Sequence, residues 1–197
     1  MRRLYATLFL LCAACSSAPT PSSSSIQDTS SIDAQGMRTI QYSMHLNAPP
    51  AEVYQAVSTV EGWKTWAVPS AFGEAKVGGI METTYDRTAK AGDPKSIQQE
   101  FLALVPERLV VFRTIRTPPG FPHADLFVKT TTAIKLDPEG SGTRMVFTHA
   151  GFGPGEGYDQ LYGFFSEGNK STLEQLKKRF ETGPIDWAAK EAASEKP

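Results

Sequence analysis

The sequence has little cysteine and no cluster of basic residues. Its only two cysteines, Cys12 and Cys15, lie close to the N-terminus, so the rest of the chain offers no disulfide, thiol nucleophile or cysteine-based metal site. The formal net charge of the 197 residues is −1. Because nucleic-acid binding depends on basic patches that neutralise phosphates, this composition argues against a nucleic-acid partner.

No hydrophobic run is long enough to span a membrane as a helix. The short apolar run near the start has the pattern of a bacterial export signal. Arg2 and Arg3 precede an apolar run over residues 4–11, which is far shorter than the roughly 20 residues that span a bilayer. Small residues follow, as in a signal-peptide cleavage region. We therefore expect residues 1–18 to direct export to the cell envelope.

The end of this segment resembles a lipobox, the site at which a bacterial lipoprotein is cleaved and lipidated. Cys15 follows Ala13 and Ala14, while Cys12 stands where a lipobox usually has leucine. We expect a lipid on Cys15 that anchors the protein to a membrane facing the periplasm. The alternative is ordinary cleavage after Ala18, which would give a soluble periplasmic or secreted protein.

Composition divides the rest of the chain into three parts. Residues 19–36 are rich in serine, threonine and proline, which bury too little apolar surface to fold, and we predict a disordered tether. The globular domain is expected over residues 37–183. Residues 184–197 follow a Gly-Pro stop and are predicted to be a frayed C-terminal tail, in which Trp187 docks on the domain.

Alternation of apolar and polar residues predicts a series of strands in the globular part. They are joined by short turns, which favours an antiparallel sheet. The predicted strands are residues 37–46, 72–77, 79–86, 97–105, 109–115, 124–136 and 143–150, with two short helices at 51–59 and 61–66 after the first strand.

The last part of the domain has the period of one long amphipathic helix. Its apolar face comprises Tyr158, Tyr162, Phe165, Asn169, Leu173, Leu176 and Phe180. One helix covers a single face of a sheet, so the sheet must curve around it. The predicted fold class is α+β: a helix-grip fold in which a curved antiparallel sheet of about six or seven strands wraps around one long C-terminal helix.

The order of several short motifs resembles the SRPBCC or START-like superfamily, in the branch named after the activator of the heat-shock-protein-90 ATPase. The motifs lie at residues 48–54, 63–66, 78–79, 106–110, 148–152 and 158–165, and the resemblance extends over roughly residues 37–183. It implies a deep, mostly apolar cavity between sheet and helix. Superfamily members use this cavity for lipids, hormones, polyketides and aromatic compounds, and a minority are enzymes.

The resemblance leads us to expect a small hydrophobic or aromatic ligand and no cofactor. Relatives often carry a tryptophan where this chain has Asn169. The asparagine is expected to make the pocket of this chain more polar at that point. The candidate cavity residues are Trp63, Trp66, Tyr85, Phe101, Phe112, Phe147, His149, Tyr158, Tyr162, Phe165 and Asn169.

Several of these residues have an ordinary structural interpretation beside the functional one. Both tryptophans and the tyrosines of the helix can be plain core. His149 is either a satisfied histidine at a strand end or a polar anchor and proton donor. Asn169 needs partners when buried, and these are either a protein carbonyl or a ligand group.

Catalysis and metal binding have little support in the sequence. The three histidines lack the close spacing of a metal site, and no catalytic residue is assigned. One alternative function is a cyclase, dehydratase or isomerase with His149, Tyr158 or Asp125 as acid–base groups. Another is a protein-interaction domain of the cell envelope. The glycine-rich residues 151–157 are expected to form a flexible lid or hinge over the cavity.

Overall fold

A curved antiparallel sheet forms because every second side chain of its strands is apolar and turns to one common face. The computed structural model describes residues 26–194, and its strand order is β1–β3–β9–β8–β7–β6–β5–β4, with β2 also paired to β3. The strands are β1 (Gln27–Asp28), β2 (Ser31–Ile32), β3 (Arg38–Leu46), β4 (Ser70–Gly73), β5 (Ile80–Thr84), β6 (Ile97–Val105), β7 (Leu109–Arg116), β8 (Thr131–Glu139) and β9 (Gly142–Phe152).

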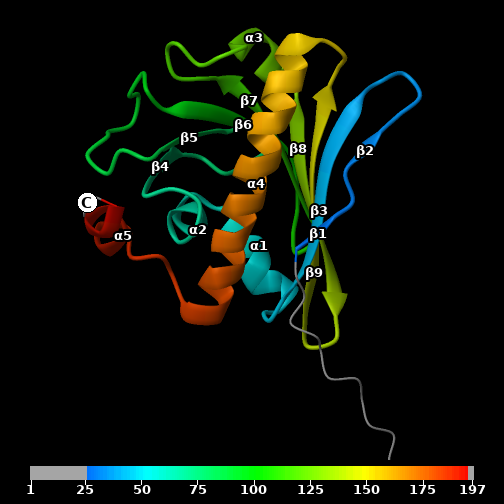
Figure 1. Ribbon diagram of the computed structural model, residues 1–197. Helices are drawn as coiled ribbons and strands as arrows, with labels where there is room; N and C mark the ends of the chain where they lie inside the picture. The colour runs from blue at the N-terminus through cyan, green and yellow to red at the C-terminus, as the bar shows by residue number, and fades with distance from the viewer. Residues whose placement is uncertain (1–25, 195–197) are drawn as a thin grey trace, which may run out of the picture.

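One long helix, α4 (Glu156–Thr182), crosses the concave face of this sheet (Figure 1). The smaller helices are α1 (Pro50–Ser58), α2 (Val60–Lys64), α3 (Ala124–Phe127) and α5 (Trp187–Ser194). In Figure 1, α1 and α2 lie beside the lower, C-terminal part of α4, and α3 lies near its upper end. The predicted helix-grip fold is confirmed: β3 to β9 give seven strands, to which β1 and β2 add two very short ones.

The lower half of α4 is held by apolar burial. Leu173 and Leu176 are 2% and 0% exposed, as their place in the predicted stripe requires. Burial of a leucine side chain contributes about 1.5–3 kcal/mol. The hydroxyl of Tyr42 in β3 donates a hydrogen bond to the carbonyl of Ser166 at 3.0 Å, which joins the sheet to the middle of the helix.

The prediction of a disordered tether is wrong for residues 26–36. Gln27 and Asp28 pair with Ser43 and Tyr42, and β2 pairs with the start of β3. Such edge pairing rests on backbone hydrogen bonds, which do not depend on apolar side chains. The export signal, Cys15 and residues 19–25 lie outside the described residues.

The predicted strand over residues 124–136 is wrong in its first half. Residues 124–127 form the short helix α3, and the strand begins only at Thr131, which pairs with Ala150. His123 precedes the helix with a φ of 51°, so the chain turns sharply there. The apparent alternation at positions 124, 126 and 128 therefore spans a helix and a turn.

The tail is more ordered than predicted. Trp187 does contact the domain, because its ring N–H donates to the carbonyl of Lys64 at 2.6 Å. The residues after it are not frayed as expected but form α5, and Arg87 pairs with Glu191 at 3.0 Å. The tail thus packs beside α2.

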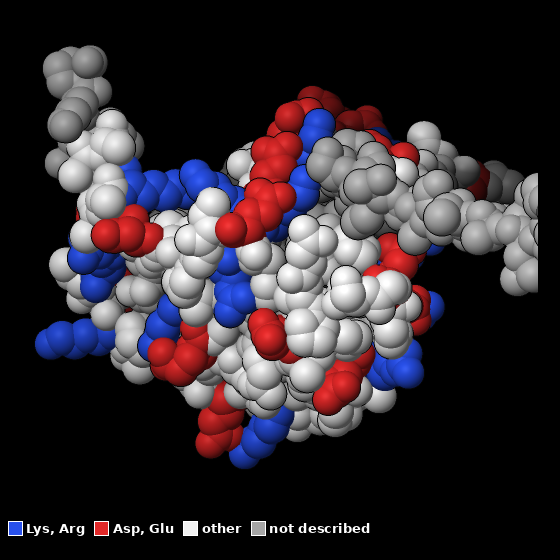
Figure 2. Space-filling view, turned by 90° about the horizontal axis from the view of Figure 1, so that it is seen from below, with Lys and Arg blue, Asp and Glu red and all other residues white. Residues whose placement is uncertain are grey.

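The surface carries both signs of charge close together. On the face drawn in Figure 2, acidic and basic side chains alternate around an uncharged area. Such mixing does not create the one-sided positive field that attracts nucleic acid. Within residues 26–194, none of the helices is both long and apolar enough to cross a membrane.

A close contact of two helices positions the residues discussed below. A Cβ atom at Gly62 of α2 would lie 2.1 Å from the carbonyl oxygen of Gln55 in α1, so no larger residue fits without backbone movement. The contact turns α2 back against the end of α1. It thereby directs Trp63 and Trp66 toward the sheet.

We expect Gly62→Ala to lower the free energy of unfolding by about 1–3 kcal/mol, because an overpacked contact must be relieved by backbone shifts. The matched control is Gly163→Ala in α4, where a Cβ meets nothing within 4 Å. That change should raise stability by roughly 0.5–1 kcal/mol through helix propensity. Urea unfolding measures both, and equal effects would contradict the close α1–α2 contact.

Candidate functional site

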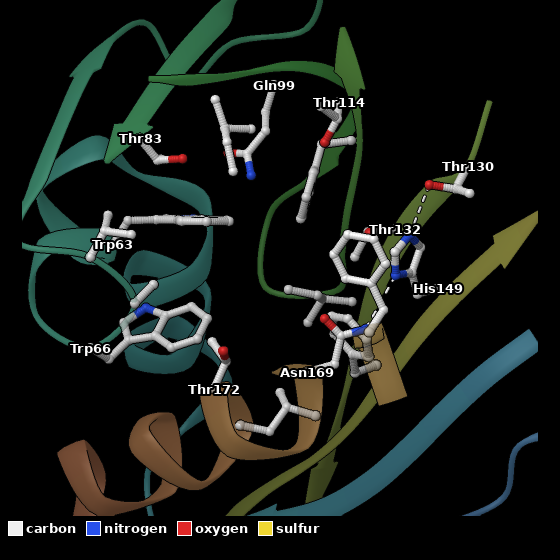
Figure 3. Close-up of a pocket in the computed structure, with 18 of the residues that line it drawn as sticks. Trp63, Trp66, Thr83, Gln99, Thr114, Thr130, Thr132, His149, Asn169 and Thr172 are labelled. Atoms are coloured by element: carbon white, nitrogen blue, oxygen red, sulfur yellow. Dashed lines mark hydrogen bonds between the residues drawn. The ribbon is translucent and has the colours of Figure 1, made fainter. Parts of the chain in front are cut away.

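A cavity of about 170 Å³ lies between α4 and the concave face of the sheet. Its lining comes from α2 and the turn after it, from strands β5 to β9, from α3 and from α4 (Figure 3). Eight of the candidate residues line it: Trp63, Trp66, Tyr85, Phe112, Phe147, His149, Phe165 and Asn169. Tyr85 lies at the rim, with 66% of its surface exposed.

Three candidates do not line the cavity. Phe101 is fully buried and packs edge-on behind Phe112, with ring centroids 6.2 Å apart. Tyr162 packs edge-on against Phe152, and the guanidinium of Arg38 lies 5.1 Å from its ring centre. Tyr158 lies against Gly153. The first turns of α4 therefore cover the β3–β9 edge of the sheet and leave the cavity to the helix middle.

The glycine-rich segment shares this placement, so the predicted lid is wrong. None of residues 151–157 is among those that line the cavity. Arg38 holds the segment instead: one guanidinium nitrogen lies 2.6 Å from the Asp159 carboxylate, and another donates to the Gly153 carbonyl at 2.8 Å. Phe127 of α3 borders the cavity instead, and its ring centre lies 4.4 Å from that of Phe165.

The two tryptophans are both core and cavity wall. Their ring N–H groups donate to the carbonyls of Val57 and Ala56, each at 2.9 Å. These carbonyls belong to the last turn of α1, which has no further helix to supply partners. Trp63 also packs edge-on against Phe112, with centroids 5.5 Å apart. The hydrogen bonds fix both indoles as a rigid apolar wall.

A row of polar residues crosses the upper part of the cavity, and the sequence interpretation missed it. On strands β5 to β9 the inward face changes from apolar to polar toward the same end of the sheet, as with Met81 and Thr83 of β5. Gln99 pairs directly with Thr114, and Thr132 pairs directly with His149. The row consists of Thr83, Gln99, Thr114, Thr132 and His149, all buried.

The signal for this row was present in the alternation. Gln99 stands two positions before Phe101, and Thr114 two positions after Phe112, so each polar residue shares the face of a candidate cavity residue. They were not among the predicted cavity residues because that prediction relied mainly on aromatic side chains. Phe127 was missed for another reason, because the strand predicted over 124–136 put it on the outer face.

His149 is neutral and both of its ring nitrogens are engaged. Its Nδ1 accepts a hydrogen bond from the Asn169 amide at 3.2 Å, and its Nε2 lies 2.8 Å from the Thr130 hydroxyl. That hydroxyl donates to the Phe127 carbonyl at 2.8 Å, so it must accept from His149. The proton of the ring therefore sits on Nε2.

Burial among aromatic rings lowers the pKa of His149 to about 3. Phe152 and Phe165 lie edge-on at 4.7 and 5.0 Å between ring centres, where they exclude the water that would stabilise an imidazolium. The histidine is thus a satisfied polar anchor. The partner of Asn169 is this imidazole, and in Figure 3 the amide oxygen of Asn169 turns toward the cavity.

Charged groups are missing from the wall. None of the residues that line the cavity is an aspartate, glutamate, lysine or arginine. Asp125 and Tyr158, considered above as acid–base groups, are not among them. Among residues 26–194, no group of three His, Cys, Asp or Glu side chains is placed to hold a metal ion. The site can enclose an uncharged molecule and offer it hydrogen bonds.

Comparison with known proteins identifies both family and fold. Residues 47–181 match the family described as activator of Hsp90 ATPase homolog 1-like protein. The solution structure of the Aha1 dimer from Colwellia psychrerythraea superposes with a TM-score of 0.58 at 20% identity, over 74% of this chain and 97% of that one. No curated protein matches the chain.

Two further solved structures have the same fold. CalU16 from Micromonospora echinospora gives a TM-score of 0.55 at 19% identity, over 80% of this chain and 86% of that one. Protein MLL2253 from Mesorhizobium loti gives 0.59 at 18%, over 75% of this chain and all of that one. At these identities the likeness establishes the helix-grip fold and leaves the ligand open.

We expect stability to fall on acidification because of His149. The unfolded state binds a proton near pH 6.5, while the folded state rejects it down to about pH 3, so this residue's stabilising contribution is complete above pH 6.5 and declines below it. The slope is about 1.4 kcal/mol per pH unit. Urea unfolding at pH 7 and pH 4.5 should show a loss roughly 2–3 kcal/mol smaller in His149→Gln. Equal losses would contradict the buried neutral imidazole.

Proposed function

Because the chain belongs to the family of activator of Hsp90 ATPase homolog 1-like proteins, we propose that it binds one small, uncharged aromatic or hydrophobic molecule between sheet and helix. The cavity carries this proposal. Its volume is about 170 Å³ and its walls are mostly apolar, with Trp63, Phe112 and Phe147 among them. An apolar cavity of about 150 Å³ in another protein takes up benzene, so the size suits a molecule of one or two rings.

The same volume argues against larger ligands. Pockets that enclose drug-sized molecules measure about 300–1,000 Å³. A sterol or a full lipid chain would require α4 to move away from the sheet, against the burial of Leu173 and Leu176. We therefore place the ligand at the small end of the range known for the superfamily.

An enzyme is the weaker candidate. General acid–base catalysis needs a group whose pKa lies near the working pH, but burial holds the pKa of His149 at about 3. Both ring nitrogens of this histidine already have protein partners. A binding function requires no such group.

A surface beside the cavity bears on the alternative of a protein-interaction domain. Phe164 of α4 is 61% exposed and borders a second pocket together with Phe121 and Leu161. A single exposed aromatic residue is common on soluble proteins. This alternative would gain weight if apolar molecules failed to enter the cavity.

We also propose that the protein is exported and lipid-anchored through Cys15, on the sequence pattern given above. The first described strand, β1, begins at Gln27. The ten residues 16–25 precede Ile26, and ten residues reach at most about 35 Å when fully extended. The anchor would thus hold the domain close to the membrane.

The ligand proposal predicts saturable one-to-one binding of naphthalene to the wild-type protein. Thr132→Phe should weaken binding at least about tenfold, because the new ring occupies the cavity. The control is Thr131→Phe, whose residue precedes it on β8 and is not among those that line the cavity. NMR titration that follows the indole N–H signals measures affinity, and circular dichroism verifies folding. Equal binding by both variants would contradict the site.

The anchor proposal predicts the mass of the mature N-terminus. Intact mass spectrometry of protein from a bacterial envelope should show a chain that begins at Cys15 and carries lipid. Cys15→Ala should abolish the lipid mass, whereas the matched change Cys12→Ala should leave it in place. A mature chain that begins near Pro19 without lipid would establish ordinary secretion.

A further inference from the structure

One side chain of the cavity wall has a polar atom without a partner. Among the described residues, three buried side-chain atoms lack any hydrogen bond: Ser96 Oγ, Gln99 Oε1 and Arg116 Nε. Only Gln99 of these lines the cavity. Its side chain hangs from β6 into the space between Thr83, Thr114 and Trp63 (Figure 3). Gln99 is buried, with 9% of its surface exposed.

An unpaired amide at this place costs stability. A buried polar group without a partner destabilises the folded state, whereas an apolar side chain would suit the neighbouring Phe112 and Ile97 without that cost. Gln98, the preceding residue, shows the ordinary outcome, because its amide donates to the Glu82 carboxylate at 2.9 Å. The amide nitrogen of Gln99, which Figure 3 shows at the cavity end of the side chain, is the group that a ligand can reach.

His149 and Gln99 differ in the hydrogen-bonding capacity that they can offer to a ligand. His149 uses both ring nitrogens on Asn169 and Thr130, and Thr130 donates onward to Phe127. On β6, next to Thr83, the amide oxygen of Gln99 has no partner and its amide nitrogen turns into the cavity. A ligand with one polar group can therefore place that group beside Gln99.

Resting on the proposed function, we propose that Gln99 is a specificity-determining residue that selects ring compounds bearing a neutral hydroxyl group. A hydroxyl oxygen can accept a hydrogen bond from the amide nitrogen that Figure 3 shows turned into the cavity, and its own proton remains free to be donated to a neighbouring oxygen. Thr114, directly paired with Gln99, and Thr83 offer further hydroxyls around it.

The lack of charged side chains on the cavity wall narrows the class of ligand further. A carboxylate or phosphate in this cavity would be buried without a counter-charge, because no lysine or arginine lines it. The rings of Trp63 and Phe112, packed edge-on against each other, provide an apolar wall in the same cavity as Gln99. Phenols and naphthols satisfy both conditions.

The test compares 1-naphthol with naphthalene, two probes that differ by one hydroxyl. NMR titrations with the indole N–H signals give the affinity of each probe for the wild type, Gln99→Leu and Gln98→Leu. Gln98→Leu is the matched control, since it removes the same group from the adjacent position of β6, where the amide bonds Glu82 instead of facing the cavity. Urea unfolding establishes that each variant folds.

We expect the wild type and Gln98→Leu to bind 1-naphthol at least about tenfold more tightly than naphthalene, a gain of about 1.4 kcal/mol. In Gln99→Leu the ratio should fall to about two or less, with naphthalene binding retained and the free energy of unfolding unchanged or raised.

The other outcomes separate the two proposals. Equal affinity of both probes for the wild type overturns the role of Gln99 and leaves the ligand-binding proposal standing. A preference that survives Gln99→Leu does the same. If neither probe binds the wild type, the proposed function fails and this inference fails with it. Should Gln99→Leu not fold, the wild-type ratio still decides, and Gln99→Met repeats the comparison.

Discussion

A single helix has to cover a sheet that is much wider than itself. An α-helix with its side chains is about 10–12 Å across, whereas the six spacings between β3 and β4 amount to roughly 29 Å at 4.8 Å each. The sheet reduces the mismatch by curving, and α1 and α2 fill the space below. The part of the concave face that these helices leave unfilled is the cavity. The site is therefore a direct result of covering a wide sheet with one helix.

The change from apolar to polar residues along strands β5 to β9 separates stability from recognition. The lower layer, with Leu136, Met145 and Leu176, is fully buried and holds the helix on the sheet. The upper layer lines the cavity, so its polar side chains are placed to meet a ligand, although His149 is also packed against Phe152 and Phe165. Trp63 belongs to both layers, since its hydrogen bond to Val57 supports α1 while its ring forms the cavity wall.

The sequence predicted the helices and strands that follow from the period of apolar residues. It failed where tertiary contacts determine how those elements pack. Strand β6 was placed at residues 97–105, as observed, and the stripe through Leu173 and Leu176 revealed α4. Period alone could not show that α4 crosses the sheet at an angle that takes Tyr158 and Tyr162 away from the cavity. Nor could composition reveal β1, because its pairing with β3 depends on backbone groups and on tertiary contacts of neighbouring residues such as Ile26 and Ser30. The polar row required knowledge of which strand faces look inward.

The pairing of β3 with β9 also determines when the molecule can become complete. Arg38 lies opposite Phe152, so these neighbours are more than one hundred residues apart along the chain. Contacts of such long range require closure of a large loop before they contribute any stability, and proteins dominated by them fold slowly. Because β1 and β2 pair only with β3, the first third of the domain has no finished edge until almost the whole chain is present. The sheet of this protein can therefore be completed only once β9 is available to pair with β3.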